Sequence, residues 1–234
     1  MDVKPIPGLE HLPFAEVWFH EIDDDSFGSA SAAARAIGKA GLEAWTTDRA
    51  PEVVAFLEAR GFSEVRRYVI SELDVAAAAP AEPPAYEIVS LADRPDLVPG
   101  VYAIACESYV DQPGREDQRM PPFDEWRGWG LDPHLADAYL VALEHGEPIG
   151  YGYLERDDGR ATHGFMAVAR GARGRGVAGA LKHAQIAWAQ THGITALRTA
   201  TETRLTQMRA LNDRHGYRRL YDEIVLRGPA RLPN

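Results

Sequence analysis

The most informative stretch of the sequence is AVARGARGRGVAGALKHAQIAWA, residues 167–189. Its first ten residues contain three glycines and three arginines. After them, Val177, Leu181, Ala184 and Trp188 recur at the spacing of one helical face, which is typical of a helix packed against a sheet. The stretch therefore predicts a loop rich in glycine and arginine that leads directly into an amphipathic helix.

The composition of this loop favours an anionic ligand such as a phosphate. Backbone N–H groups at a helix start have no partner within the helix and lie at the positive end of its dipole, so they attract anions. In RGRGVA, residues 173–178, the small residues let a diphosphate approach the backbone, and Arg173 and Arg175 add positive charge. We expect this loop to bind a diphosphate.

Two other phosphate-binding motifs fit the spacing less well. A P-loop needs a lysine and then a serine or threonine after its last glycine, whereas valine and alanine follow here. Residues 174–179, GRGVAG, spell GxGxxG, but the dinucleotide-binding motif requires a parallel strand–helix–strand unit. Residues 138–168 instead indicate three antiparallel strands, joined by turns at His145-Gly146 and Asp158-Gly159.

A change in composition divides the chain near residue 80. The stretch VAAAAPAEPPAYE, residues 75–87, combines small residues with three prolines and is typical of a stiff linker. We expect one domain over residues 1–78, a linker over 79–85 and a second domain over 86–234. Residues 1–85 carry 7 basic and 15 acidic side chains, and the rest carry 18 and 20, so the loop belongs to the less acidic domain.

The two predicted domains share an order of strand, helix, glycine with an aromatic residue, and strand. One copy starts at Gly41 and has Gly61-Phe62 at its helix exit, and the other starts at Gly193 and has Gly216-Tyr217. We interpret the shared order as the trace of a duplication; the alternative is a chance similarity of two strand–helix–strand units.

Bulk composition narrows the class of protein. A chain of 234 residues, 45% hydrophobic, can bury one large core or two small ones. Its net charge of -10 argues against binding to nucleic acid. The single cysteine, Cys106, excludes an internal disulfide and a cysteine zinc cluster. No secretion signal or apolar run of about 20 residues is present, so we expect a cytoplasmic protein without a membrane partner.

Residues 163–216 resemble the acetyl-CoA-binding core of the GNAT superfamily of N-acetyltransferases. The signature of that family is Arg or Gln, two residues, Gly, one residue, and then Gly or Ala. Arg173, Gly176 and Ala178 occupy these positions. The similarity in the order and spacing of the surrounding elements covers residues 86–227.

The resemblance implies an α/β fold of the α+β kind, with a mixed, mostly antiparallel sheet flanked by helices. The sheet would be split between the strand that ends at Val168 and the strand ALRTAT, residues 196–201. The first domain resembles a partial, degenerate copy of the same fold, because residues 26–41 lack the arginine and glycine signature. This layout is similar to tandem acetyltransferases of the mycothiol synthase type.

The resemblance also implies a set of residues that bind acetyl-CoA as cosubstrate. Main-chain groups of the strand end would bind the pantetheine arm, and the Val168 N–H would polarise the thioester carbonyl. These strand residues are Met166, Ala167 and Val168. The amides of the loop would hold the diphosphate, and they belong to Arg173, Gly174, Arg175, Gly176, Val177 and Ala178. No metal is expected.

The residues that would move a proton differ from those of the family. Many members carry a Glu six residues before the valine and a Tyr four residues before the helix-ending glycine, and these positions are Thr162 and Asn212 here. Asn212 is either a contact to the cofactor or a polar residue of the helix surface. We therefore consider other residues as proton carriers.

Three residues are candidate catalytic groups, each with a plainer interpretation. Glu202 follows the strand beside the split and is either a base acting through water or a carboxylate at a helix start. His163 titrates near neutral pH or simply faces solvent. Asp111, like its neighbour Glu107, either holds a cationic amine or is an exposed helix acid.

The predicted function is transfer of an acetyl group from acetyl-CoA to a primary amine of a small molecule, by a monomer or homodimer. The acceptor is not defined by the sequence; an amino sugar, an amino acid or an antibiotic is compatible with it. Trp126 and Trp129 either line the acceptor cleft or anchor their Pro-rich loop. A non-catalytic acyl-CoA-binding or regulatory module is the alternative, because both usual proton carriers are missing.

Overall fold

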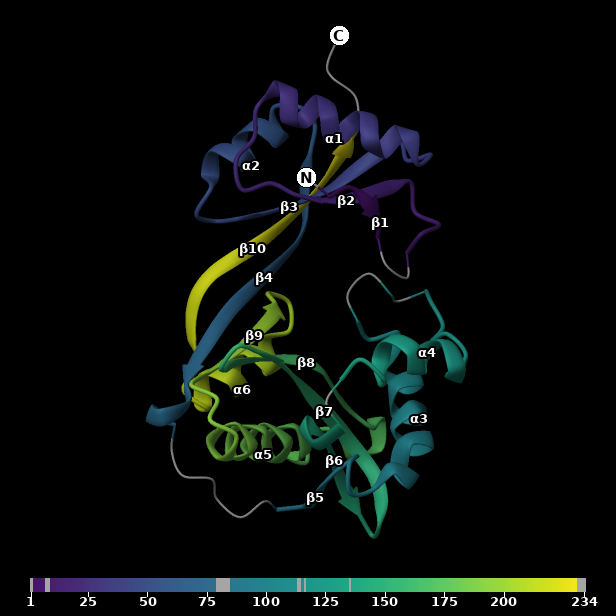
Figure 1. Cartoon of the computed structure of the whole chain (residues 1–234), viewed down its shortest axis with the longest axis vertical. Coiled ribbons are helices and arrows are strands. Elements are labelled where there is room, and N and C mark those ends of the chain that lie inside the picture. The colour runs from purple at the N-terminus through teal and green to yellow at the C-terminus, as the bar shows by residue number, and fades with distance from the viewer. Residues whose placement is uncertain are drawn as a thin grey trace. The chain divides into compact units, whose positions relative to one another are not determined.

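The computed structural model describes residues 2–6, 9–78, 85–112, 115, 117–134 and 136–230. The chain forms two compact units, whose elements are labelled in Figure 1. The first unit comprises Met1–Ile70, Thr201–Thr206 and Arg219–Asn234, and the second unit comprises Ser71–Ala200 and Gln207–Arg218.

The first unit contains a twisted sheet with the strand order β1-β2-β3-β10-β4. Strand β2 is parallel to β3, whereas β1 pairs with β2 and β10 pairs with β3 in the antiparallel sense. The elements are β1 (Lys4–Pro5), β2 (Phe14–Trp18), α1 (Asp24–Ala36), β3 (Gly41–Thr47), α2 (Pro51–Glu58), β4 (Ser63–Asp74) and β10 (Arg218–Pro229).

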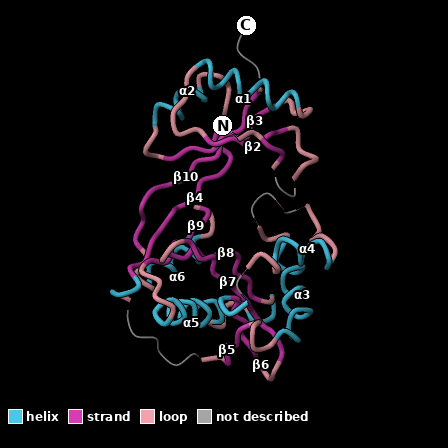
Figure 2. Tube along the Cα trace, viewed as in Figure 1, coloured by secondary structure: helices cyan, strands magenta, loops and turns pink. Residues whose placement is uncertain are grey.

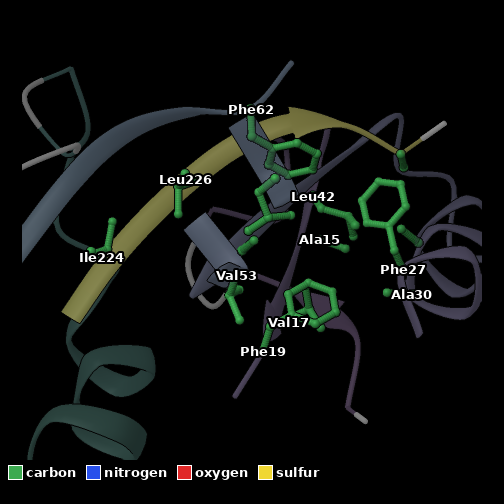
Figure 3. Close-up of a cluster of buried hydrophobic side chains, with 14 of the residues drawn as sticks. Ala15, Val17, Phe19, Phe27, Ala30, Leu42, Val53, Phe62, Ile224 and Leu226 are labelled. Atoms are coloured by element: carbon green, nitrogen blue, oxygen red, sulfur yellow. The ribbon is translucent and has the colours of Figure 1, made fainter. Parts of the chain in front are cut away.

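Both helices of the first unit pack on the same face of its sheet. Alternate residues of β2 and β3, such as Val17 and Leu42, join α1 and α2 in one hydrophobic core, which Figure 3 shows. Phe27 of α1 is fully buried in this core and makes edge-to-face contacts with Phe56 and Phe62, each at 5.9 Å between ring centroids. The apolar alternation of the strands therefore fixes which face the helices cover.

The opposite face of this sheet carries a buried ion cluster. Glu43 of β3 is completely buried and lies opposite Arg227 of β10 in the strand register. Its carboxylate accepts hydrogen bonds from Arg66 at 2.6 Å and from Arg227 at 2.7 Å. Two guanidinium groups thus compensate one buried carboxylate, which would be costly to bury alone.

The second unit contains the strand order β4-β9-β8-β7-β6-β5. Strands β5 to β8 pair in antiparallel fashion, and β8 pairs with β9 in parallel. The elements are β5 (Glu87–Ser90), α3 (Val98–Tyr109), α4 (Phe123–Gly130), β6 (Tyr139–Glu144), β7 (Glu147–Asp157), β8 (Arg160–Val168), α5 (Val177–Thr191), β9 (Ala196–Glu202) and α6 (Thr206–Arg214).

Helices cover both faces of the sheet in the second unit (Figures 1 and 2). Val141 of β6 packs in the core of α3 and α4, whereas its neighbours Leu140 and Ala142 pack against α5. The turns at His145-Gly146 and Asp158-Gly159 join β6 to β7 and β7 to β8, with positive φ at all four residues. The predicted α/β fold with a mixed, mostly antiparallel sheet is confirmed.

One segment differs from the sequence-based prediction. The Pro-rich loop expected between α3 and β6 contains the helix α4. This helix begins directly after Pro122, has Asp124 and Glu125 in its first turn and buries Trp126, so proline starts the helix here rather than excluding it. Of the expected linker 79–85, residues 79–84 lie outside the described residues.

Each unit contains a strand from the other half of the sequence. In the first unit, the parallel pair β2 and β3 is extended by β10, and in the second unit the parallel pair β8 and β9 is extended by β4. A duplication would produce this repeated arrangement, and it stays a prediction. The domain limits 1–78 and 86–234 remain a prediction. The compact units divide the chain differently, because residues 219–234 belong to the first unit.

Phe27→Ala tests the core of the first unit. We expect it to lower the free energy of unfolding by about 3–5 kcal/mol, because it removes a fully buried ring and leaves a cavity. Urea denaturation followed by circular dichroism measures the change. Ile37→Ala, at the exposed end of the same helix, is the control and should change stability by less than about 1 kcal/mol. Equal effects of both substitutions would contradict this packing.

Candidate active site

The central feature of the site is a separation of β8 from β9. The two strands pair in parallel from Arg160 opposite Ala196 to Thr162 opposite Arg198. Within the described residues, no further pair joins them, although β8 continues to Val168. From residue 163 onward, the edge of β8 that faces β9 is therefore free to bind a ligand through its backbone.

A β-bulge in β8 causes the strand to turn away. On the other side of β8, Gly152 of β7 pairs with Met166 and Leu154 pairs with His163, so that two residues of β8 oppose Tyr153 alone. Such a bulge bends the strand that carries the extra residue. Glycine is required at residue 164, because a Cβ there would lie 1.9 Å from the Tyr153 ring. The sequence therefore encodes the separation locally.

The loop after β8 presents an uncapped helix start. Gly174 and Gly176 have φ of 74° and 88°, a conformation that favours glycine. Gly176 is the N-cap of α5, so the helix receives no side-chain cap. A Cβ added at either glycine would meet no atom within 4 Å, which shows open space above the loop. The first N–H groups of α5 are therefore accessible to an anion.

Helix α3 holds this loop in place. The Arg173 Nε donates to the Val168 carbonyl at 3.0 Å, and its guanidinium forms an ion pair with Asp111 at 2.7 Å. The Arg170 N–H donates to the Glu107 carboxylate at 2.7 Å. Asp111 and Glu107, considered above as groups that bind an amine, thus contact the loop arginines instead.

A buried polar cluster lies where β8 leaves β9. We use this name for His163, Lys182, Gln185 and Tyr217. The His163 ring contacts the Gln185 Oε1 at 3.0 Å and forms a second hydrogen bond with the Tyr217 hydroxyl. The Lys182 Nζ lies 4.7 Å from the centre of the Tyr217 ring. The Gln185 Nε2 is buried and has no hydrogen-bond partner among the described residues.

Burial keeps the polar cluster close to neutral. It lowers the pKa of Lys182 to about 7, and this side chain is only 2% exposed. The pKa of His163 lies well below its usual value, because burial and the Lys182 charge both disfavour the imidazolium. Burial raises the pKa of Tyr217. At neutral pH the cluster therefore contains an uncharged imidazole, an uncharged phenol and a lysine near its midpoint.

The remaining predicted residues lie in different places. Met166 and Val168 pack on the α5 side of the sheet, whereas Ala167 is buried on the α3 side. Asn212 is buried in α6 of the second unit. Glu202 lies at the end of β9 in the first unit, and its Oε1 accepts a hydrogen bond from Arg204 at 2.5 Å.

Sequence patterns did not reveal Lys182, Gln185 or Tyr217 as site residues. Lys182 directly follows Leu181, which belongs to the apolar stripe of α5. A lysine beside such a stripe is usually solvated at its tip, so periodicity gives only a weak signal. The contact with Tyr217 spans 35 residues and depends on the fold.

The sequence of residues 98–217 matches the acetyltransferase (GNAT) family. The chain belongs to this family. Membership supports acetyltransferase activity in general and acetyl-CoA as the usual cosubstrate of GNAT proteins. No curated protein matches the chain.

Solved GNAT structures share the fold. A GCN5-related N-acetyltransferase from Sphaerobacter thermophilus has a TM-score of 0.73 and 16% identity, covering 100% of this chain and 77% of that protein. A tandem GNAT protein from the clavulanic acid biosynthesis pathway has a TM-score of 0.71 and 17% identity, covering 96% and 78%. A GCN5-related N-acetyltransferase from Kribbella flavida has a TM-score of 0.58 and 18% identity, covering 92% and 81%.

The described part of the chain contains neither a candidate membrane span nor a candidate metal site. None of its helices is both long and apolar enough to cross a membrane. In the same residues, no group of three or more His, Cys, Asp and Glu side chains is arranged to bind a metal ion.

Lys182→Met tests the buried lysine of this GNAT domain. An unfolded lysine has a pKa of about 10.4, so between pH 7 and that value the unfolded chain binds more protons and the wild type gains stability as pH rises. The variant lacks this titration. The free energy of unfolding of the variant should therefore exceed that of the wild type, and by most at pH 7. This excess should shrink by roughly 3 kcal/mol between pH 7 and pH 9.5.

Urea denaturation at several pH values measures this difference. His163 and His215, whose pKa values are lowered, and Tyr217, whose pKa is raised, contribute little between pH 7 and 9.5. Lys4→Met, at a half-exposed lysine, is the matched control for removing a lysine side chain. If the difference in free energy of unfolding between Lys182→Met and the wild type does not change with pH, a charge-related penalty at this position is ruled out.

Proposed function

We propose that this GNAT protein transfers an acetyl group from acetyl-CoA to a primary amine of a small molecule, by direct attack of the amine on the thioester. One observation carries the proposal. The uncapped, glycine-bounded start of α5 directly follows the strand whose edge is released from β9. A helix start for the diphosphate and a free strand edge for the pantetheine arm are thus provided within 15 residues of chain.

The loop residues fit a diphosphate in both shape and charge. Gly174 and Gly176 leave the space above the backbone open, and the N–H groups from Arg173 to Ala178 would bind the phosphate oxygens. Arg173 is also held by Asp111 and Arg175 by Glu144. These ion pairs fix the arginine side chains, so the backbone amides supply most of the contacts.

The free edge of β8 fits the pantetheine arm. Main-chain groups of Met166 and Val168 would bind its amides, and the Val168 N–H would polarise the thioester carbonyl. Ala167 lies between them and pairs with Tyr151 of β7. The buried Gln185 Nε2 is an N–H donor without a partner in the described residues, and it lies beside the same part of β8. A ligand acceptor atom would satisfy it, and Asn212 of α6 is a second amide that we assign to the cofactor.

Among the candidate proton carriers, the contacts favour His163. Attack requires an uncharged amine, and the nitrogen must lose a proton when the C–N bond forms and the C–S bond breaks. His163 is neutral at pH 7, lies at the point where β8 leaves β9, and is hydrogen-bonded to the Tyr217 hydroxyl. His163 lies five residues before Val168 along β8, so we propose that this pair accepts the amine proton through water, while Asp111 positions the loop and Glu202 pairs with Arg204.

A non-catalytic acyl-CoA-binding module is the alternative function. Thr162 and Asn212, which occupy the two usual positions of the proton carriers, support it. Release of free CoA from acetyl-CoA in the presence of amines distinguishes the two. Turnover that falls at least about tenfold in His163→Gln supports the enzyme, whereas binding without turnover over a broad panel of amines supports the module.

Gly176→Glu tests the proposed diphosphate site. The new carboxylate would repel the diphosphate and replace its favourable contacts with the backbone amides. Because two charge-assisted hydrogen bonds are worth about 3 kcal/mol or more, affinity for acetyl-CoA should fall at least about 100-fold. Isothermal titration calorimetry measures it. Gly193→Glu is the matched control, since Gly193 is also exposed, has φ of 69° and has no neighbour within 4 Å of an added Cβ. Unchanged affinity for acetyl-CoA in a folded Gly176→Glu variant would contradict the proposed diphosphate site.

A further inference from the structure

The second unit contains an aromatic pocket of about 180 Å³ that the proposed chemistry has not used. We use this name for the cavity on the α3 and α4 side of β7 and β8. Its walls are formed mainly by large apolar side chains, including Met120, Trp126, Trp129, Tyr151, Tyr153 and Phe165.

The floor of the aromatic pocket is rigid and buried. The Tyr139 ring stacks on Tyr151 at 5.6 Å and on Tyr153 at 5.0 Å between centroids. Trp126 is buried against Tyr102 and Phe123. Stacked rings that are held from several sides keep their positions when a ligand binds, so this pocket is preformed.

The rim of the pocket is an exposed tryptophan. Trp129 is 47% exposed, although Trp126 in the same helix is buried. A partly exposed indole that lines a cavity of aromatic side chains gains buried apolar area when a flat apolar ligand enters. The two tryptophans of α4 thus have separate roles, since one anchors the helix and the other faces the opening.

The lining residues that the structure describes carry no charged side chain. Their polar side-chain groups are the Gln112 amide, the indole N–H groups of Trp126 and Trp129, and tyrosine hydroxyls. Burial raises the pKa of Tyr139, Tyr151 and Tyr153, so these hydroxyls stay neutral. A sugar ring would leave several hydroxyl groups without partners here, and a free carboxylate would find no cation among the lining residues that the structure describes. The chemistry of the walls therefore selects an aromatic or other apolar ring.

The volume sets the size of the ligand. An apolar cavity of about 150 Å³ accommodates benzene, so about 180 Å³ accommodates one six-membered aromatic ring with one or two further carbons. Larger fused ring systems would need to extend past Trp129.

The pocket lies close to the proposed reaction centre. Phe165, which lines the pocket, is part of the bulge in β8, and Tyr151 of the floor pairs with Ala167. Val168, whose N–H is assigned to the thioester carbonyl, is the next residue along the strand. A short alkyl chain is therefore long enough to carry a nitrogen from the pocket toward this part of β8.

We infer that the acetyl acceptor is an aromatic primary amine, in which a single ring fills the aromatic pocket and a short alkyl chain carries the amino group. The inference rests on the proposed function for the transfer step. It narrows the acceptor from amines in general to an arylalkylamine and disfavours amino sugars and amino acids.

The test compares acetylation of 2-phenylethylamine with that of glucosamine and glycine, using acetyl-CoA and the full chain. We expect kcat/KM to be at least tenfold higher for 2-phenylethylamine. Trp129→Ala should raise its KM about tenfold and leave the affinity for acetyl-CoA unchanged. Trp18→Ala, at a tryptophan that is 38% exposed and lies outside the pocket lining, is the matched control and should leave the KM unchanged.

A binding measurement separates this inference from the proposed function. Saturation-transfer NMR with 2-phenylethylamine alone should show ring contacts that are lost in Trp129→Ala. If glucosamine or glycine is acetylated as efficiently as the aromatic amine, or if Trp129→Ala affects all amines equally, the inference is wrong while the acetyl transfer stands. If the aromatic amine binds at Trp129 but no amine is acetylated, the proposed transfer is wrong and the ring site stands.

Discussion

The β-bulge at Gly164 and Phe165 is the constraint on which both parts of the site depend. In a regular strand, His163, Phe165 and Ala167 would face the same side of the sheet. Because two residues of β8 oppose Tyr153, His163 instead faces α5 and contacts Gln185, whereas Phe165 and Ala167 face α3. One extra residue thus places a polar cluster on one face and an aromatic pocket on the other, a few residues apart along one strand.

Local patterns in the sequence predicted these parts of the fold because turns and helix starts depend on residues that are neighbours in the chain. The turns at His145-Gly146 and Asp158-Gly159 and the glycine loop before α5 depend on neighbouring residues and are confirmed in the structure. The helix α4 was missed because prolines preceded it. The contact of Lys182 with Tyr217, and the cavity that Trp129 lines together with rings of β7 and β8, join distant segments, and neither periodicity nor spacing encodes them.

In each parallel strand pair, a helix connects the first strand to the second, and the two helices differ in the charge at their starts. Helix α5 begins at an uncapped glycine beside arginines. Helix α1, which follows β2, begins instead with Asp23, whose carboxylate accepts the Ser26 N–H at 2.7 Å, and with Asp24 and Asp25 in its first turn. The Ser26 N–H is thus already satisfied and the start of α1 is acidic, so a phosphate would be repelled there. This contrast gives a physical reason why the diphosphate site is proposed only at α5.

The position of β10 has a consequence for how the chain folds during synthesis. Leu226 of β10 pairs with Ala44 and Pro229 pairs with Gly41, so the first unit needs a strand that is made long after its other elements. Its core also includes Ile224 and Leu226. Until β10 has been made, the edge of β3 that it pairs with has no partner strand, and contacts between such distant residues form slowly. Synthesis of β10, rather than of the first half of the sequence, therefore allows the first unit to close.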